Sequence, residues 1–185
     1  MTGSPLPPSI RDLLDEVGVF QYGVIRVAGL VFSGEVRRMC EMNTCRKYGT
    51  TWACPPALGT VSECRERCRR FDHMLLFSVK YDLEDSYDFE GMMEGQKKFK
   101  ETARALALRI RPRLGEHLIL SNEGCGICAV CTYPDAPCRF PEQVQGSLEG
   151  YGFFVNQLAG AAGMNYINGQ NTVTYFGAVL YNEFV

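Results

Sequence analysis

Hydrophobic residues recur at helical spacing in several segments of the chain. The longest such pattern makes one face of residues 91–113 apolar, as expected of an amphipathic helix. The residues on that face are Phe99, Ala103, Leu106 and Ile110. Shorter patterns predict three further helices, over residues 9–17, 60–71 and 141–163.

The helix over residues 60–71 has the clearest start signal. Thr60 and Glu63 form the T-x-x-E capping box. Its charged side predicts i,i+4 ion pairs from Glu63 to Arg67 and from Glu66 to Arg70. Its apolar stripe consists of Val61, Cys64, Cys68 and Phe71. In the helix over residues 9–17, Ser9 is the expected cap.

Apolar segments without a helical period predict strands. Residues 74–81 are almost continuously apolar, which is typical of a strand in a sheet covered on both faces. Strands are expected over residues 22–27, 74–81, 117–120, 164–167 and 172–181, whereas residues 39–57 show no period and are expected to form a loop. The pattern predicts an α/β or α+β fold. We expect residues 1–185 to form a single domain, with a mixed sheet of about five strands flanked by helices and two cysteine-rich loops that bind metal.

Composition narrows the classes of protein that fit. The chain has 185 residues, 46% hydrophobic content and a net charge of −2, so we expect neither nucleic acid nor an anionic membrane as a partner. The start of the chain lacks the basic and apolar regions of a signal peptide, and the apolar residues 19–32 are too few to span a bilayer. A cytoplasmic location is therefore expected. Its reducing conditions favour metal ligands over disulfides for the nine cysteines.

Four cysteines gathered in a short segment are the strongest chemical signal. Cys125, Cys128, Cys131 and Cys138 read C-x2-C-x2-C-x6-C, and we call them the quartet. The first three match the opening of the bacterial ferredoxin motif, whose thiolates hold the irons of a [4Fe–4S] cluster. Zinc held by four thiolates is the main alternative, although zinc sites usually contain two separated C-x2-C pairs. The spacing favours iron–sulfur over zinc, and over a redox thiol pair or simply buried cysteines.

A second group lies upstream and lacks an obvious fourth ligand. Cys40, Cys45 and Cys54, here called the upstream trio, are expected to share a metal centre, with Gly49 allowing a tight turn and Pro55 stiffening the chain. Cys64 is the nearest fourth thiolate, close to a helix N-terminus that would favour its charge. It is equally compatible with a place in the core. For Cys68 we expect packing alone.

Basic and aromatic residues surround both groups. Cationic side chains would offset the negative charge of a cluster, and Arg139 is of special interest because it directly follows Cys138. Aromatic side chains would shield a cluster from water. The basic residues are Arg37, Arg38, Arg46, Lys47 and Arg139, and the aromatic ones are Tyr48, Trp52 and Phe140.

These motifs resemble a bacterial and archaeal family of cysteine-rich proteins described as predicted metal-binding, a domain of unknown function. The resemblance rests on Cys45-Arg-Lys-Tyr-Gly, on Trp52-Ala-Cys-Pro-Pro, on Gly124-Cys-Gly-Ile-Cys-Ala-Val-Cys, and on Pro137-Cys-Arg-Phe-Pro-Glu with Ser147 and Glu149 after it. It covers about residues 19–181. It implies binding of metal or of an iron–sulfur cluster through the quartet and the upstream trio, but no particular reaction.

The leading hypothesis is an iron–sulfur protein that transfers electrons to or from a partner protein. It would hold one [4Fe–4S] cluster on the quartet and a second centred on the upstream trio, for which Cys64 is the candidate fourth thiolate. A small reductase or activase with an open iron site is the enzymatic alternative, and a zinc protein whose metal fastens loops is the structural one. The sequence identifies neither the substrate, nor the partner, nor the oligomeric state.

Overall fold

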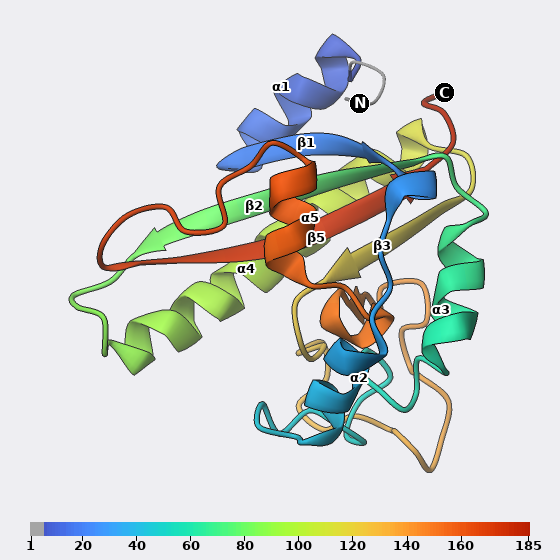
Figure 1. Cartoon of the computed structure of the whole chain (residues 1–185), viewed down its shortest axis with the longest axis vertical. Coiled ribbons are helices and arrows are strands. Elements are labelled where there is room, and N and C mark those ends of the chain that lie inside the picture. The colour runs from blue at the N-terminus through green and yellow to red at the C-terminus, as the bar shows by residue number, and fades with distance from the viewer. Residues whose placement is uncertain (1–5) are drawn as a thin grey trace.

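A five-stranded sheet with the strand order β1-β2-β5-β3-β4 forms the centre of the molecule (Figure 1). The computed structural model describes residues 6–185. Neighbouring strands run antiparallel except β3 and β4, which are parallel, so the sheet is mixed. The strands are β1 (Gln21–Arg26), β2 (His73–Asp82), β3 (His117–Ser121), β4 (Gly146–Ser147) and β5 (Thr172–Tyr181).

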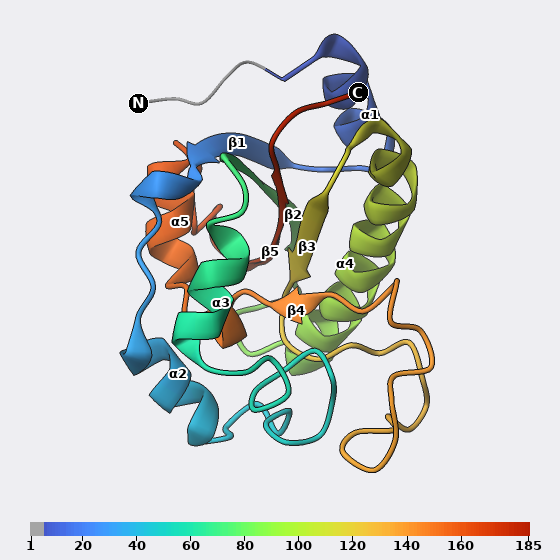
Figure 2. The same ribbon diagram turned by 90° about the vertical axis from the view of Figure 1, so that its right-hand side faces the viewer.

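Helices cover both faces of this sheet (Figures 1 and 2). One face packs against α1 (Pro8–Glu16) and α4 (Phe89–Ile110), and the other against α3 (Val61–Cys68) and α5 (Val155–Ala161). The remaining helix, α2 (Gly34–Glu41), lies beyond the end of the sheet together with long loops (Figure 1). Short 3-10 helices occur at η1 (Val27–Gly29), η2 (Arg111–Arg113) and η3 (Glu149–Tyr151).

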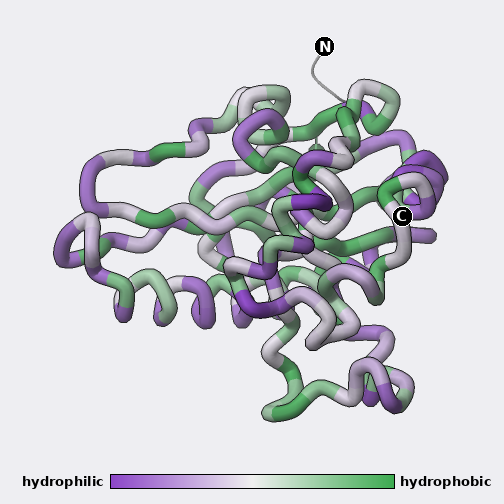
Figure 3. The backbone as a smooth tube through the Cα atoms, turned by 60° about the horizontal axis from the view of Figure 1, so that its bottom comes forward, coloured by the Kyte–Doolittle hydropathy of each residue, from purple (hydrophilic) through white to green (hydrophobic). Residues whose placement is uncertain are grey.

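Alternate residues of β2 enter two separate hydrophobic cores. Met74 and Leu76 face α3 and α5, whereas Leu75 and Phe77 face α1 and α4. This alternation is the period of two that a pleated strand imposes. In Figure 3 hydrophobic stretches of the tube run through the interior and also through a loop at the bottom of the view, and the coil at the lower left alternates between hydrophobic and hydrophilic residues. Burial on both faces explains the almost continuous apolar run that predicted this strand.

The predicted fold class is confirmed, and so are several elements. The strand expected over residues 172–181 matches β5, and the four residues of the apolar face of α4 are all buried. The capping box of α3 forms in both directions, because Glu63 Nα–H donates to Thr60 Oγ1 and Thr60 Nα–H donates to Glu63 Oε2. The helix ends three residues earlier than expected.

Other local predictions are wrong. Residues 34–41 form α2, capped by Ser33, where only an irregular loop was expected from residue 39. The helix predicted over residues 141–163 is replaced by β4, η3 and the short α5, because several glycines disfavour a continuous helix. Residues 164–167 are not a strand. Ser9 does not cap α1, which begins with Pro8 after Pro7.

The two i,i+4 ion pairs expected on α3 do not form. Glu63 is engaged in the capping box, and Glu66 pairs with Arg69 instead. Arg70 pairs with Glu116, outside the helix. All these pairs are exposed, so little stability depends on the difference. Within residues 6–185, no helix is both long and apolar enough to cross a lipid bilayer.

We expect Phe99→Ala to lower the free energy of unfolding by about 3–5 kcal/mol, because Phe99 is fully buried against Phe77 and Tyr175 beneath the sheet. Leu108→Ala on the same helix is the control, since Leu108 is 73% exposed. Denaturant unfolding of both variants measures the difference. Equal loss in the two variants would contradict the assignment of this core.

Candidate metal centre

The cysteine-rich loops meet at one end of the sheet (Figure 2). One loop joins α2 to α3 and carries Cys45 and Cys54. The other joins β3 to β4 and carries the quartet. All nine cysteines are free thiols, so no disulfide fastens these loops.

The four thiols of the quartet line one cavity of about 310 Å³. Each of these cysteines is partly exposed, so the cavity lies close to the surface. Trp52 and Phe140, two of the aromatic residues expected to shield a cluster, also line it. The structure therefore brings together the residues that the spacing singled out, although they span fourteen positions of an irregular loop.

A few polar contacts hold the quartet loop in shape. The Arg139 guanidinium donates to the carbonyl of Val130 at 2.9 Å, and Trp52 Nε1–H donates to the carbonyl of Ala136 at 3.2 Å. The Trp52 ring also packs edge-on against Tyr133, with 4.9 Å between ring centroids. The amide of Phe140 donates to Cys138 Sγ at 3.4 Å. Arg139 thus links two positions of the quartet loop by a hydrogen bond to Val130.

The upstream trio lines a second cavity, of about 380 Å³. Cys40 lies in the last turn of α2, Cys45 is exposed and Cys54 is buried. The expected turn at Gly49 is present, with a φ of 67°, and its amide donates to the carbonyl of Pro55 at 2.8 Å. The three thiols therefore line one cavity, and the metal centre expected on them stays a prediction. Most of the cavity wall is apolar, with Met39, Met42 and Tyr48 among its residues.

Two carboxylates that sequence reasoning did not assign to the site line the same cavity. They are Glu123 and Glu149, and Ser147 lies beside them. Burial raises the pKa of Glu149 to about 7, and the nearby charge of Glu123 adds to the shift. Burial also raises the pKa of Cys40 to about 11, with a further contribution from Glu149. The only signal in the sequence was the occurrence of Ser147 and Glu149 in the family motif.

The two cavities adjoin. Lys47 lines both of them, and a Cβ on Gly124 would lie 3.4 Å from its Cδ atom. The amide of Gly124 donates to Cys54 Sγ at 3.2 Å, and the next residue is Cys125 of the quartet. One hydrogen bond and one residue of backbone therefore connect a thiol of the upstream trio with a thiol of the quartet.

Helix α4 anchors the start of the quartet loop through two cationic side chains. Lys100 Nζ donates to the carbonyls of Asn122 at 3.0 Å and Gly124 at 2.7 Å, and Arg104 donates to the carbonyl of Cys125 at 3.2 Å. Burial lowers the pKa of Lys100 to about 8, although the charge of Glu123 opposes the shift. Sequence analysis missed both residues because a helix pattern does not reveal which distant loop its polar face will meet.

Arg37 is a partly buried cation close to the upstream cavity. Its guanidinium donates to the carbonyls of Gly59 and Gly150, which joins α2 to η3 and to the start of α3. A second arginine, Arg67, donates to the carbonyl of Leu58. These contacts fasten the loop between α2 and α3 to the sheet and the helices that cover it.

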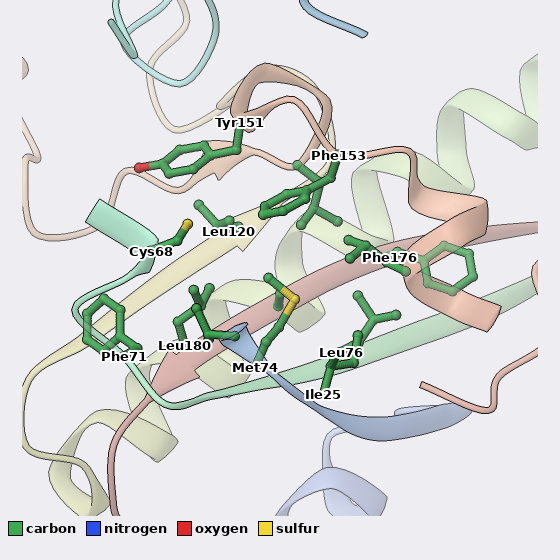
Figure 4. Packing of buried hydrophobic residues seen from close by; sticks show 14 of the residues in the cluster. Ile25, Cys68, Phe71, Met74, Leu76, Leu120, Tyr151, Phe153, Phe176 and Leu180 are labelled. Atoms are coloured by element: carbon green, nitrogen blue, oxygen red, sulfur yellow. The ribbon is translucent and has the colours of Figure 1, made fainter. Parts of the chain in front are cut away.

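The structure places Cys64 and Cys68 apart from both cavities. Both are fully buried in the hydrophobic core of the sheet face covered by α3, and Figure 4 shows Cys68 close to Leu120. Burial raises the pKa of Cys68 to about 12. Cys64 Sγ lies 3.4 Å from the Leu58 carbonyl and accepts a hydrogen bond from Arg67 at 3.1 Å. The packing role expected for Cys68 agrees with this location, whereas Cys64 is not brought together with the upstream trio.

The donor set fits a thiolate-bound metal group in each cavity. In residues 6–185, no three His, Cys, Asp or Glu side chains already converge at the distances of ligands to one metal ion. The thiols instead line the walls of two cavities. Soft, anionic sulfur is the ligand type that iron–sulfur clusters require.

The fold and this site define a class: a cysteine-rich, metal-binding α+β domain. The chain belongs to the family described as predicted metal-binding protein (DUF2284), whose model matches residues 23–181. This confirms the resemblance seen in the cysteine motifs. No curated protein and no solved structure gave a significant match.

We expect Lys100→Met to lower the free energy of unfolding by about 1.5–3 kcal/mol, because the carbonyls of Asn122 and Gly124 lose a charged donor. The amide of Gly124 should also exchange its hydrogen faster. Lys97→Met, at an exposed position of the same helix, is the control. If both variants behave alike in unfolding and exchange, Lys100 does not anchor the quartet loop.

Proposed function

We propose that the protein is an iron–sulfur protein that transfers electrons to or from a partner protein. The observation that carries this proposal is the single cavity lined by all four thiols of the quartet. Cys125, Cys128, Cys131 and Cys138 would hold a [4Fe–4S] cluster, which supplies one-electron chemistry when bound. Zinc would serve the loops only as a structural fastener.

The surroundings of the quartet support an electron-transfer role. Lys47 and Arg139 line the cavity and would offset the negative charge of a thiolate-bound cluster. Two hydrophobic residues close to the thiols are exposed, Val130 at 77% and Phe140 at 41%. Exposed apolar side chains beside a redox centre are suited to a transient contact with a partner protein. Nine free thiols also suit the reducing cytoplasm, where we place the protein.

A second centre on Cys40, Cys45 and Cys54 is part of the same proposal. The cavity that these thiols line adjoins the quartet cavity, and the Gly124 amide joins the two through Cys54 Sγ. A hydrogen bond to a ligating sulfur raises the reduction potential of a cluster. Two neighbouring centres would allow an electron that enters at the exposed quartet to reach the upstream cavity.

One observation favours a second candidate function, that of a small reductase. The upstream cavity of about 380 Å³ falls in the size range of small-molecule sites, and its walls are mainly apolar. A substrate bound there would lie beside the upstream thiols. In this reading the quartet delivers electrons, and the upstream cavity is where they are used.

Anaerobic purification followed by iron, zinc and acid-labile sulfide analysis tests the proposal. We expect a brown protein with iron and sulfide in equal amounts, because sulfide-to-iron and thiolate-to-iron charge transfer absorbs visible light. A colourless protein that contains zinc without sulfide would instead establish the structural role. Absence of both metals after reconstitution with iron and sulfide would contradict metal binding by these cavities.

Cys128→Ser should remove one of two centres, so that iron and sulfide fall to about half. It should also lower the melting temperature, because the quartet loop has few other stabilising contacts. Cys68→Ala is the matched control, since this thiol is buried in the core and lines neither cavity. The control should keep its full iron content and lose only packing energy. Full iron content and unchanged melting in Cys128→Ser would show that the quartet holds no cluster.

A further inference from the structure

The upstream trio offers three thiolates, and a four-iron cluster has four irons to ligate. Cys64, the expected fourth thiolate, lies in the core and does not line the cavity. The residues that do line it include two carboxylates that could ligate iron through oxygen, Glu123 and Glu149. The two carboxylates differ in their hydrogen-bond partners.

Glu149 carries a buried oxygen that nothing in the fold satisfies. Its Oε2 is inaccessible to solvent and has no hydrogen-bond partner among residues 6–185. Burying a carboxylate oxygen without a partner costs free energy, and such groups occur where a ligand completes the contacts. Glu123 differs, because its Oε1 accepts a hydrogen bond from Gln96 Nε2. Of these two carboxylates, only Glu149 has a buried oxygen left without a partner.

The backbone that carries Glu149 is fixed against the upstream trio. Ser147 Nα–H donates to the carbonyl of Ala53 at 2.9 Å, beside Cys54. The next turn packs so closely that a Cβ on Gly150 would lie 2.4 Å from Ser147 Oγ and 3.1 Å from Pro55 Cδ. Only glycine allows this approach. Glu149 therefore starts η3 at a position set by the chain around Cys54.

Helix α2 fixes the same turn from the other side. Arg37 donates to the carbonyl of Gly150, and Ser33 Nα–H donates to the carbonyl of Gly152 at 2.8 Å. Cys40 lies one turn further along this helix. The backbone on both sides of Glu149 is thus fixed by contacts that also position the chain around Cys40 and Cys54, and rigid support of this kind is what a ligand requires.

We infer that Glu149 is the fourth protein ligand of the upstream centre, an inference that rests on the proposed cluster there. Its ionised carboxylate would donate an oxygen lone pair to the iron that the three thiolates leave free, and any proton on it would leave to solvent. Oxygen is a harder ligand than sulfur and holds iron less firmly. The upstream centre would therefore have one iron whose protein ligand exchanges more readily than thiolate.

The full chain, reconstituted anaerobically with iron and sulfide, provides the test. We expect Glu149→Gln to lose about one iron per chain, released as Fe²⁺, and to show the EPR signal of an oxidised three-iron cluster after a mild one-electron oxidant is added. The wild type, with all irons ligated, should show no such signal. Cys64→Ala and Cys68→Ala are the controls, because neither thiol lines a cavity, and both should keep the iron content and the EPR-silent oxidised state of the wild type.

Glu149→Cys keeps the inference testable if Glu149→Gln fails to fold, which circular dichroism would reveal. A thiolate at this position should retain the iron and change the EPR spectrum of the reduced upstream centre. Unchanged iron and EPR spectra in Glu149→Gln, or an unchanged reduced spectrum in Glu149→Cys, would overturn the assignment while leaving the clusters in place. A three-iron signal in the wild type would overturn it too. A wild type without iron and sulfide would instead remove the proposed function itself.

Discussion

The architecture depends on a sheet whose central strands are buried on both faces. β2 and β5 pair along ten residues each, and their side chains fill two cores at once. Both faces of the sheet are covered in the part of the chain that the structure describes. The cavities lined by cysteines therefore lie at the end of the sheet, among the loops. Those loops are rich in cysteine and poor in regular structure, and contacts with the neighbouring helices hold them in place. The cations Lys100, Arg104 and Arg37 supply several of these contacts.

The same contacts explain how loops from distant parts of the sequence form one site. The segment around Cys54 and the segment around Gly124 lie 70 residues apart, and a single amide-to-sulfur hydrogen bond joins them. Lys100 on α4 donates to the carbonyl of Gly124. A helix, and not the loops alone, therefore fixes the position of one cavity relative to the other. Ligands positioned in this way keep their mutual distances when the charge of a bound group changes.

The two cavities differ in a manner that suits different tasks. The quartet lies near the surface beside exposed Val130 and Phe140, a setting for contact with another protein. The upstream trio lines an apolar cavity that also contains a buried carboxylate, Glu149. Thiolates alone make a strongly held and electron-rich centre, whereas a mixed sulfur and oxygen set makes one iron more accessible. In the function proposed above, the quartet would be an outer centre that exchanges electrons with a partner, and the upstream cavity would be an inner site suited to a small molecule.

The sequence by itself determined the clustering of the cysteines and the main elements of the fold. The spacing of Cys125, Cys128 and Cys131 and the apolar runs of β2 and β5 are local signals, because they depend on residues close together in the chain. Glycine-rich residues 141–163 had no reliable local preference, so packing of η3 against Pro55 and Leu58 decided their conformation. Local spacing likewise could not separate a core role for Cys64 from a ligand role. Only the tertiary structure placed Cys64 in the core and brought Glu149 into the upstream cavity, because burial and contacts across 100 residues are not encoded in any local pattern.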